Sequence, residues 1–396
     1  MNRIARWIAK GRCLLARLTE GRRRCARKIV TFAPGTTEEE AERILRSLGG
    51  RMVKPLPLIN GALCEIGQAA DLTAVSAHQQ VARVDDDLQV TAYPLGCWFR
   101  NPSAPRPGEQ TQPPESVPWG VARIGAPALW DQEEGAGVSV AILDTGVDLN
   151  HPDLFPNLAA GVNILNPRRP PMDDNGHGTH VAGIIAAVQN GVGVVGVAPR
   201  VRICPVKVLD RQGEGRLSDV VQGLEWCVKQ GIRIINLSLG APEGNPTFAA
   251  AVGRVQEAGA VLVAAAGNAG PDPDTIGYPA RYPQTIAVGA TTQADTVADF
   301  SSRGAELDLV APGENIPSTW PGGGYRTLSG TSMAAPHVSG LAALLLAREP
   351  GLSPGEVKLR LQESAEQLPG WSPEAQGAGL VNGPRAVGSA LLEETE

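Results

Sequence analysis

Three short segments place an acid, a histidine and a serine beside small residues. Asp144 follows an apolar run, His177 lies between two glycines, and Ser332 precedes a long apolar stretch. A serine becomes a nucleophile when a histidine takes its proton and a carboxylate orients that histidine. If folding brings these segments together, they predict acyl-transfer chemistry.

A fourth segment offers a donor for the negative charge that develops in such a reaction. Asn268 follows another apolar run and stands among alanines and glycines. Its amide N–H, together with the backbone N–H of Ser332 at a helix N-terminus, could form an oxyanion hole. Losing such an Asn costs about 10²–10³ in turnover.

Each segment has an alternative interpretation. Asp-Thr-Gly at Asp144 also fits aspartic proteases, but that chemistry needs a second carboxylate, and no second Asp-Thr/Ser-Gly occurs in the sequence. His180 lies one helical turn after His177, yet the zincin pattern of two histidines at i and i+4 with an adjacent Glu is absent. We expect His180 to be packed and hydrogen-bonded. Taken alone, Asp144 could cap a turn and Ser332 could cap a helix.

The elements around these residues predict an α/β fold. Short runs that are apolar on both faces are typical of buried parallel strands, and they occur at 138–143, 203–208, 232–237, 261–266 and 285–288. Helical stretches follow or separate them at 217–229, 247–258 and 332–347. We predict a doubly wound, mostly parallel sheet with helices on both faces, and Asp144 at its carboxyl edge, where ligands bind. We expect Pro336 to fall in the first turn of its helix, where proline is tolerated.

The rest of the chain divides by composition. Residues 1–27 form a basic segment: up to Lys28 the chain has ten basic residues and one acid, although its overall net charge is −6. We expect a small α+β domain at 28–93, a proline-rich linker at 94–115 and the catalytic domain at 116–396. The apolar stretches near the N-terminus are too short for an ordinary signal peptide or a membrane span. The six cysteines show no zinc-like spacing, and we expect buried thiols.

The order Asp, His, Ser and the surrounding motifs resemble those of the subtilisin-like serine proteases. The matching motifs are Asp-Thr-Gly-Val-Asp, Gly-His-Gly-Thr-His-Val-Ala-Gly, Ala-Ala-Gly-Asn and Gly-Thr-Ser-Met-Ala-Ala-Pro-His, spread over roughly 116–390. The resemblance implies a serine endopeptidase that works through an acyl-enzyme and is made as a self-processing zymogen. The alternative is a non-catalytic pseudoprotease that binds proteins or peptides.

The resemblance also implies the residues that hold the substrate. Two edge segments would pair with an extended peptide by strand addition, and other residues would form its side-chain pockets. The implied residues are Gly213, Gly215, Leu217, Ser238, Leu239, Gly240, Ala265, Gly267 and Gly277. We expect broad specificity with room for a large apolar side chain.

A structural Ca²⁺ is implied in the same way. The side chains of Asp153 and Asn190 match the family's ligands, as do the carbonyl oxygens of Val188, Val192 and Val194. Carboxylate, amide and carbonyl oxygens suit Ca²⁺. Glu115 stands where the family has a side-chain amide, which leaves one ligand open. A glycine-rich loop without metal is the alternative.

Residues 28–93 resemble the family's inhibitory pro-region, with Tyr93 where the cleaved residue normally enters the active site. About twenty extra residues then intervene, so cleavage could follow Tyr93, fall within the linker, or both. A permanently attached accessory domain is the alternative. The expected partners are protein and peptide substrates and the chain's own pro-domain, with no nucleic acid, and we expect a monomer. The family favours an extracellular location, but without a visible signal peptide a cytoplasmic one stays open.

Overall fold

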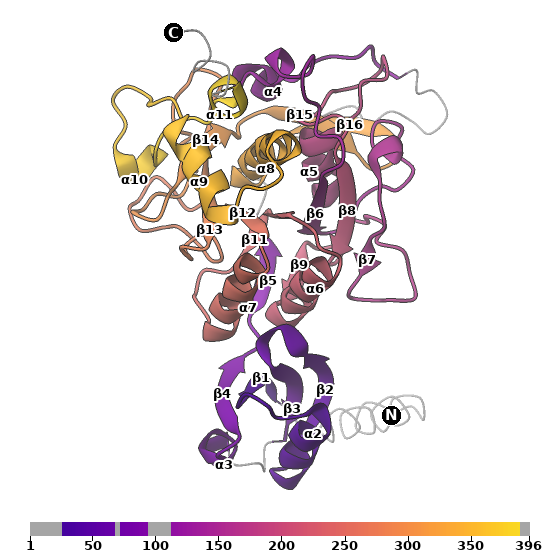
Figure 1. The fold of residues 1–396 in the computed structure, drawn as a ribbon, viewed down its shortest axis with the longest axis vertical. Coiled ribbons are helices and arrows are strands. Elements are labelled where there is room, and N and C mark those ends of the chain that lie inside the picture. Colours follow the sequence, from indigo (N-terminus) through magenta and orange to yellow (C-terminus); the bar gives the residue numbers. More distant parts are fainter. Residues whose placement is uncertain (1–25, 68–71, 94–111, 389–396) are drawn as a thin grey trace, which may run out of the picture. The chain divides into compact units, whose positions relative to one another are not determined.

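The computed structural model describes residues 26–67, 72–93 and 112–388. The chain forms two compact units that divide after Asp87 (Figure 1). The basic segment before residue 26 and most of the linker, 94–111, lie outside the described residues. No helix in the described ranges combines the length and the apolar character needed to span a membrane.

The first unit is a four-stranded antiparallel sheet with two helices. Its sheet has the order β2-β3-β1-β4, and its elements are β1 (Ala26–Phe32), α2 (Glu38–Ser47), β2 (Gly50–Leu56), a 3₁₀ turn (Pro57–Ile59), β3 (Gly61–Ile66), α3 (Leu72–Ala77) and β4 (Val81–Asp86). Thr37 and Glu40 form the reciprocal capping box that starts α2. The apolar core of the unit lies between the sheet and the helices and includes Val30, Leu45 and Val75.

Strand β2 was not predicted, and its residues explain why. It is an edge strand in which only Leu56 is buried, so its pattern lacks the apolar alternation that indicates a strand. It also contains Pro55, and proline is confined to edges within sheets.

The second unit is built on a seven-stranded parallel sheet of order β14-β13-β12-β10-β6-β8-β7. Its strands are β6 (Ser139–Asp144), β7 (Val162–Asn163), β8 (Arg202–Lys207), β10 (Ile234–Leu237), β12 (Val261–Ala265), β13 (Thr285–Thr291) and β14 (Leu309–Pro312). The chain order reverses beside β6, whose neighbours are β8 on one side and β10 on the other. The predicted doubly wound α/β fold is confirmed.

Helices cover both faces of this sheet (Figure 1). Helices α5 (His177–Ala186) and α8 (Thr331–Arg348) pack together on one face, and α6 (Leu217–Lys229) and α7 (Pro246–Glu257) pack together on the other. The smaller helices are α4 (Trp119–Arg123), α9 (Pro354–Glu363), α10 (Pro373–Gln376) and α11 (Gly383–Gly388). Two further sheets complete the unit: β11 (Leu239–Gly240), β5 (Gln89–Ala92) and β9 (Glu214–Arg216) form one, and β15 (Ile316–Trp320) and β16 (Gly324–Leu328) the other.

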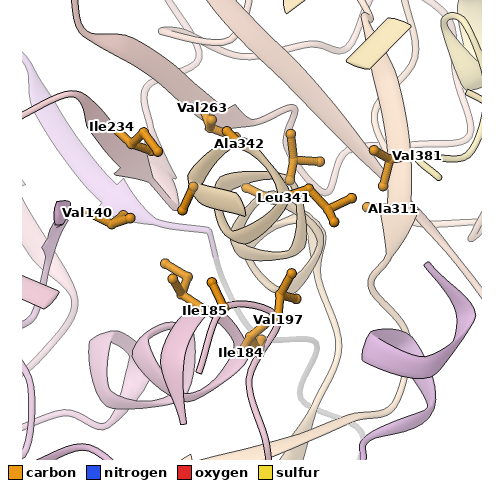
Figure 2. Packing of buried hydrophobic residues seen from close by; sticks show 14 of the residues in the cluster. Val140, Ile184, Ile185, Val197, Ile234, Val263, Ala311, Leu341, Ala342 and Val381 are labelled. Atoms are coloured by element: carbon orange, nitrogen blue, oxygen red, sulfur yellow. The ribbon is translucent and has the colours of Figure 1, made fainter. Parts of the chain in front are cut away.

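Helix α8 runs through the centre of the core. Every residue from Thr331 to Leu346 is buried, as expected for a helix that is apolar all round. Figure 2 shows Leu341 and Ala342 of this helix among Val140, Ile234 and other side chains from the sheet, α5 and the adjoining loop. Because α8 is held from all sides, its first turn has a fixed position.

The expectation for Pro336 is wrong. Helix α8 begins at Thr331, so Pro336 lies beyond the first turn, inside the helix. Proline has no N–H, so the carbonyl oxygen four residues earlier, that of Ser332, loses its helical donor. The hydroxyl of Ser238 donates to this carbonyl instead, at 2.9 Å.

Candidate active site

The structure brings Asp144 and His177 into direct contact. Asp144 is the last residue of β6 and His177 the first residue of α5. The Nδ1 atom of His177 lies 2.8 and 2.9 Å from the two carboxylate oxygens of Asp144. Their side chains are only 1% and 0% exposed, so the pair is shielded from water. Because Nδ1 faces Asp144, Nε2 is the ring nitrogen that is left for chemistry.

Glycine at 178 allows this approach. A Cβ there would lie 2.1 Å from the carbonyl oxygen of Gly146 and 3.1 Å from the Cβ of Asp144. Both distances are shorter than normal non-bonded contacts, and the first would force the backbone apart. The glycine after His177 therefore sets how closely α5 can approach the end of β6.

A second aspartate, which the sequence analysis did not single out, orders the start of α5. Asp173 accepts hydrogen bonds from the N–H groups of Gly176 and Thr179 and from the hydroxyls of Thr145 and Thr179. The hydroxyl of Thr145 in turn accepts from the N–H of Gly178. An acid shortly before a helix is a recognisable N-terminal signal, and that signal could have identified Asp173.

The surroundings of His177 favour its charged form. Burial lowers the pKa of the imidazole, but the charge of Asp144, the hydrogen bond to it and the charge of Asp173 outweigh burial and raise the pKa above 6.5. The imidazole can therefore hold a proton that it has taken from a nucleophile. Its Nε2 atom is buried and has no hydrogen-bond partner among the described residues.

His180 differs sharply from His177, although it lies on the same helix. It is fully buried and its Nε2 faces the carbonyl oxygens of Ile316 and Arg326. Burial lowers its pKa to about 3. It therefore stays neutral and serves packing, as the sequence analysis expected.

Ser332 lies in the first turn of α8, where backbone N–H groups have no helical partner. Its hydroxyl donates to the carbonyl oxygen of Ser238 at 3.1 Å, so in this geometry it is not bonded to Nε2 of His177. Two reciprocal hydrogen bonds link these serines, because the Ser238 hydroxyl also donates to the carbonyl oxygen of Ser332. Catalytic hydrogen bonds are often long or unformed before substrate binds. For His177 to accept its proton, the Ser332 hydroxyl would have to turn away from the Ser238 carbonyl.

Asn268 lies beside this turn. Its amide oxygen accepts the N–H and the hydroxyl of Thr331, both at 2.9 Å. The Thr331 hydroxyl also accepts the N–H of Gly267 at 3.1 Å. These bonds fix the amide plane of Asn268 next to the residue before Ser332. Thr331 is a positioning residue that the sequence did not reveal, because its partner lies 63 residues away.

The chain itself occupies the predicted substrate groove. Strand β5 lies antiparallel between β9 and β11, so the edge segments around Gly213–Gly215 and Leu239–Gly240 pair with a strand of the same chain. The N–H of Ala92 donates to the carbonyl of Gly213, and that of Leu217 to the carbonyl of Leu88. Val90, between them, is fully buried.

Tyr93, which follows β5, is enclosed by glycines. A Cβ at Gly240 would lie 2.1 Å from its hydroxyl oxygen and one at Gly277 2.3 Å from it, and a Cβ at Gly267 would lie 3.5 Å from the ring. The hydroxyl is buried without a partner among the described residues, and burial raises the pKa of the phenol. Three predicted substrate-binding glycines thus lie around one aromatic side chain. Ala265, by contrast, belongs to the main apolar core.

The predicted calcium ligands also lie close together. Asp153 is fully buried, and its carboxylate accepts from the side-chain amide of Asn190, the N–H of Val194 and the hydroxyl of Tyr325. Among the described residues, no hydrogen bond ends on the carbonyl oxygens of Val188, Val192 or Val194. Glu115 accepts the N–H groups of Asn190 and Gly191, which brings a second carboxylate to the loop. This donor set fits Ca²⁺.

The described part of the chain has no cluster of three or more His, Cys, Asp or Glu side chains that could hold a metal ion. A site made mainly of carbonyl oxygens would not appear as such a cluster. Two other acids, Glu306 and Asp308, are bonded to Arg281 and Lys358, so protein cations occupy that surface.

Comparison with known proteins agrees with this geometry. Residues 135–379 match the model of the subtilase family. The chain is 46% identical to subtilisin BL of Lederbergia lenta over 274 residues, which is 69% of this chain and 99% of that protein. It is 39% identical to subtilisin E of Bacillus subtilis over 343 residues, 86% of this chain and 84% of that protein. An alkaline protease of Alkalihalobacillus alcalophilus is 46% identical over 280 residues, 70% of this chain and 72% of that protein. The chain therefore belongs to the subtilase family and is a serine endopeptidase.

Proposed function

We propose that Asp144, His177 and Ser332 are the catalytic triad of this endopeptidase and that Asn268 supplies the oxyanion hole. The observation that carries the proposal is the buried contact of 2.8 Å between Asp144 and Nδ1 of His177. It fixes the tautomer in which Nε2 accepts a proton.

The steps follow from these positions. A peptide pairs with β9 and β11 as an added strand. Ser332 turns from the Ser238 carbonyl to Nε2 of His177, loses its proton and attacks the scissile carbonyl carbon. The oxyanion accepts hydrogen bonds from the Asn268 side chain and the N–H of Ser332. His177 then protonates the leaving nitrogen, and water hydrolyses the acyl-enzyme by the same route in reverse.

A fluorophosphonate probe tests this assignment. The processed enzyme should be labelled at Ser332 and lose hydrolysis of a peptide substrate in proportion to labelling. S332A should abolish both, and S329A, which changes a nearby half-buried serine, should abolish neither. Labelling that survives in S332A would refute the assignment. A folded wild type that binds peptides without label or turnover would indicate the pseudoprotease.

We propose further that residues 28–93 are an inhibitory pro-region and that the chain is a self-processing zymogen. Support comes from β5 and Tyr93, which lie where a substrate strand is expected to lie. A synthetic peptide of residues 88–93 should inhibit the processed enzyme competitively. A peptide with the same residues in scrambled order is the control, and equal inhibition by both would contradict the proposal.

We propose that Asp153, Asn190 and the carbonyl oxygens of Val188, Val192 and Val194 hold a structural Ca²⁺, with Glu115 as a further carboxylate. A bound cation would tie the loop 188–194 to the segment that precedes α4. Chelation should lower the melting temperature, and D153N should remove the difference between chelated and calcium-loaded protein. An unchanged melting temperature on chelation would contradict this site.

A further inference from the structure

The residue that follows the bound strand, Pro94, bears on whether the enzyme can cut the bond at the end of that strand. Leu88–Tyr93 lies in the groove like the acyl half of a substrate, with Tyr93 among the pocket glycines. If this segment is bound as the proposed function implies, the bond offered to Ser332 is the one that joins residue 93 to residue 94. Residue 94 is a proline.

A bond before proline is a poor substrate for this chemistry. The proline nitrogen carries a ring carbon, Cδ, where other residues carry hydrogen, and this carbon crowds the preceding residue. Acylation needs His177 to come within about 2.6–3.2 Å of the leaving nitrogen to protonate it. The ring methylene obstructs this approach, so the C–N bond after Tyr93 does not break at a useful rate.

The groove therefore binds a strand that the enzyme cannot cut at its end. Main-chain pairing on both sides, burial of Val90 and burial of the Tyr93 hydroxyl hold the strand in place. Such a strand blocks the active site for as long as it is bound. Processing then has to occur at another bond.

The pocket around Tyr93 indicates at which other bonds processing could occur. It accepts a large ring, and between residues 94 and 115 the large apolar residues that are not followed by proline are Leu95, Trp98 and Phe99. Residues 100–115 contain none. The bonds after these three residues lie a few positions beyond Tyr93 in the sequence. A second enzyme molecule could cut them, or the same molecule could do so once its strand has left the groove.

We propose that Pro94 protects the Tyr93–Pro94 bond, that Leu88–Tyr93 is in consequence an uncut autoinhibitory strand, and that the processing cut falls after Leu95, Trp98 or Phe99. The inference rests on the proposed function. Each cut is an ordinary hydrolysis: Ser332 Oγ bonds to the carbonyl carbon, the leaving nitrogen takes a proton from His177, and water releases the acid.

Full-length wild type, P94A, P102A and S332A test the proposal by mass spectrometry of the N-termini that form on incubation. Wild type should yield termini at residue 96, 99 or 100 and none at 94. P94A should add a terminus at 94. P102A removes a linker proline that does not follow the bound tyrosine, and it should behave as wild type. S332A should yield no termini.

Three results would overturn the proposal: a wild-type terminus at residue 94, wild-type termini only at other bonds, or unchanged termini in P94A. A second measurement avoids any effect of P94A on folding. The processed enzyme is given a peptide of residues 88–95, which ends at Leu95 and so lacks the bond after it, and the same peptide carrying P94A.

The P94A peptide should be cut after Tyr93 at least about 100-fold faster, the scale of a lost general-acid contribution. The unaltered peptide should inhibit without turnover. Equal cutting of both peptides would overturn this inference and leave the proposed function standing. Cutting of neither peptide, together with no fluorophosphonate label, would overturn the proposed function as well.

Discussion

The proposed catalytic region and the proposed substrate groove lie in one unit but depend on different interactions. The catalytic region, the ends of β6 and β12 with the first turns of α5 and α8, depends on buried charges and aimed side-chain bonds. The groove, β9 and β11 with the glycines around Tyr93, depends on main-chain pairing and on space. A single side-chain change should therefore cost orders of magnitude in the first region. In the second, it should mainly alter which peptide fits.

The largest effect should come from breaking the buried charge pair. D144N keeps the shape but leaves His177 without the carboxylate that fixes its tautomer. We expect kcat to fall by about 10⁴ with little change in KM, the scale known for this replacement in serine proteases. D131N, at an exposed acid, should have no effect. A loss below tenfold in D144N would place Asp144 outside the catalytic machinery.

Removal of the Asn268 amide should be the next largest effect. N268A should lower kcat by about 10²–10³, as in a subtilisin that has lost its corresponding oxyanion donor. T331V removes one bond that orients Asn268, and we expect a smaller loss of about tenfold, the value of one hydrogen bond. T331S should restore the activity. Equal losses in N268A and T331V would contradict the separate roles of donor and positioner.

The pH dependence should separate the two regions directly. The pKa of His177 is raised above 6.5, and the base must be neutral. The value of kcat/KM should therefore fall as the pH drops through that raised pKa, about tenfold per pH unit below it. The inhibition constant of the 88–93 peptide for the processed enzyme depends on main-chain bonds and should stay constant between about pH 5 and 8. If both fall together, the pH effect lies in binding and not in His177.

The smallest effect should come from the pocket. A Cβ at residue 277 would meet the Tyr93 hydroxyl at 2.3 Å, whereas the ring carbon that bears it is 3.3 Å away. G277A should slow cleavage after Tyr about fivefold, the lower end of the cost of a steric clash, and affect cleavage after Phe less. G253A, at a glycine with open space around it, is the control. Equal losses for Tyr and Phe would show that the hydroxyl does not lie against Gly277.

The sequence predicted the fold class and the main helices and strands because both depend on local apolar patterns. Strands β6, β8, β10 and β12 and helix α6 lie within about two residues of their predicted places. The edge strand β2 and the hairpin β15–β16 were missed, since partly exposed strands carry weak patterns.

The prediction of the candidate site was likewise limited to what local sequence patterns reveal. Candidates set by local motifs, such as Asp144 and His177, could be proposed directly from the sequence. Residues that act through distant partners were not, and Asp173, Thr331 and the bond from Ser332 to Ser238 are examples. The position of Pro336 was misjudged because the start of α8 depends on tertiary packing as much as on local sequence.

The burial of α8 has a consequence for biosynthesis. The proposed nucleophile, Ser332, lies at the start of a helix that fills the centre of the fold, nearly 190 residues after Asp144, the aspartate of the proposed triad. A ribosome delivers that helix only after the strands that surround it have emerged, at about 5–20 residues per second. Until then the nascent chain has no assembled triad, and it cannot cleave itself or its neighbours during translation.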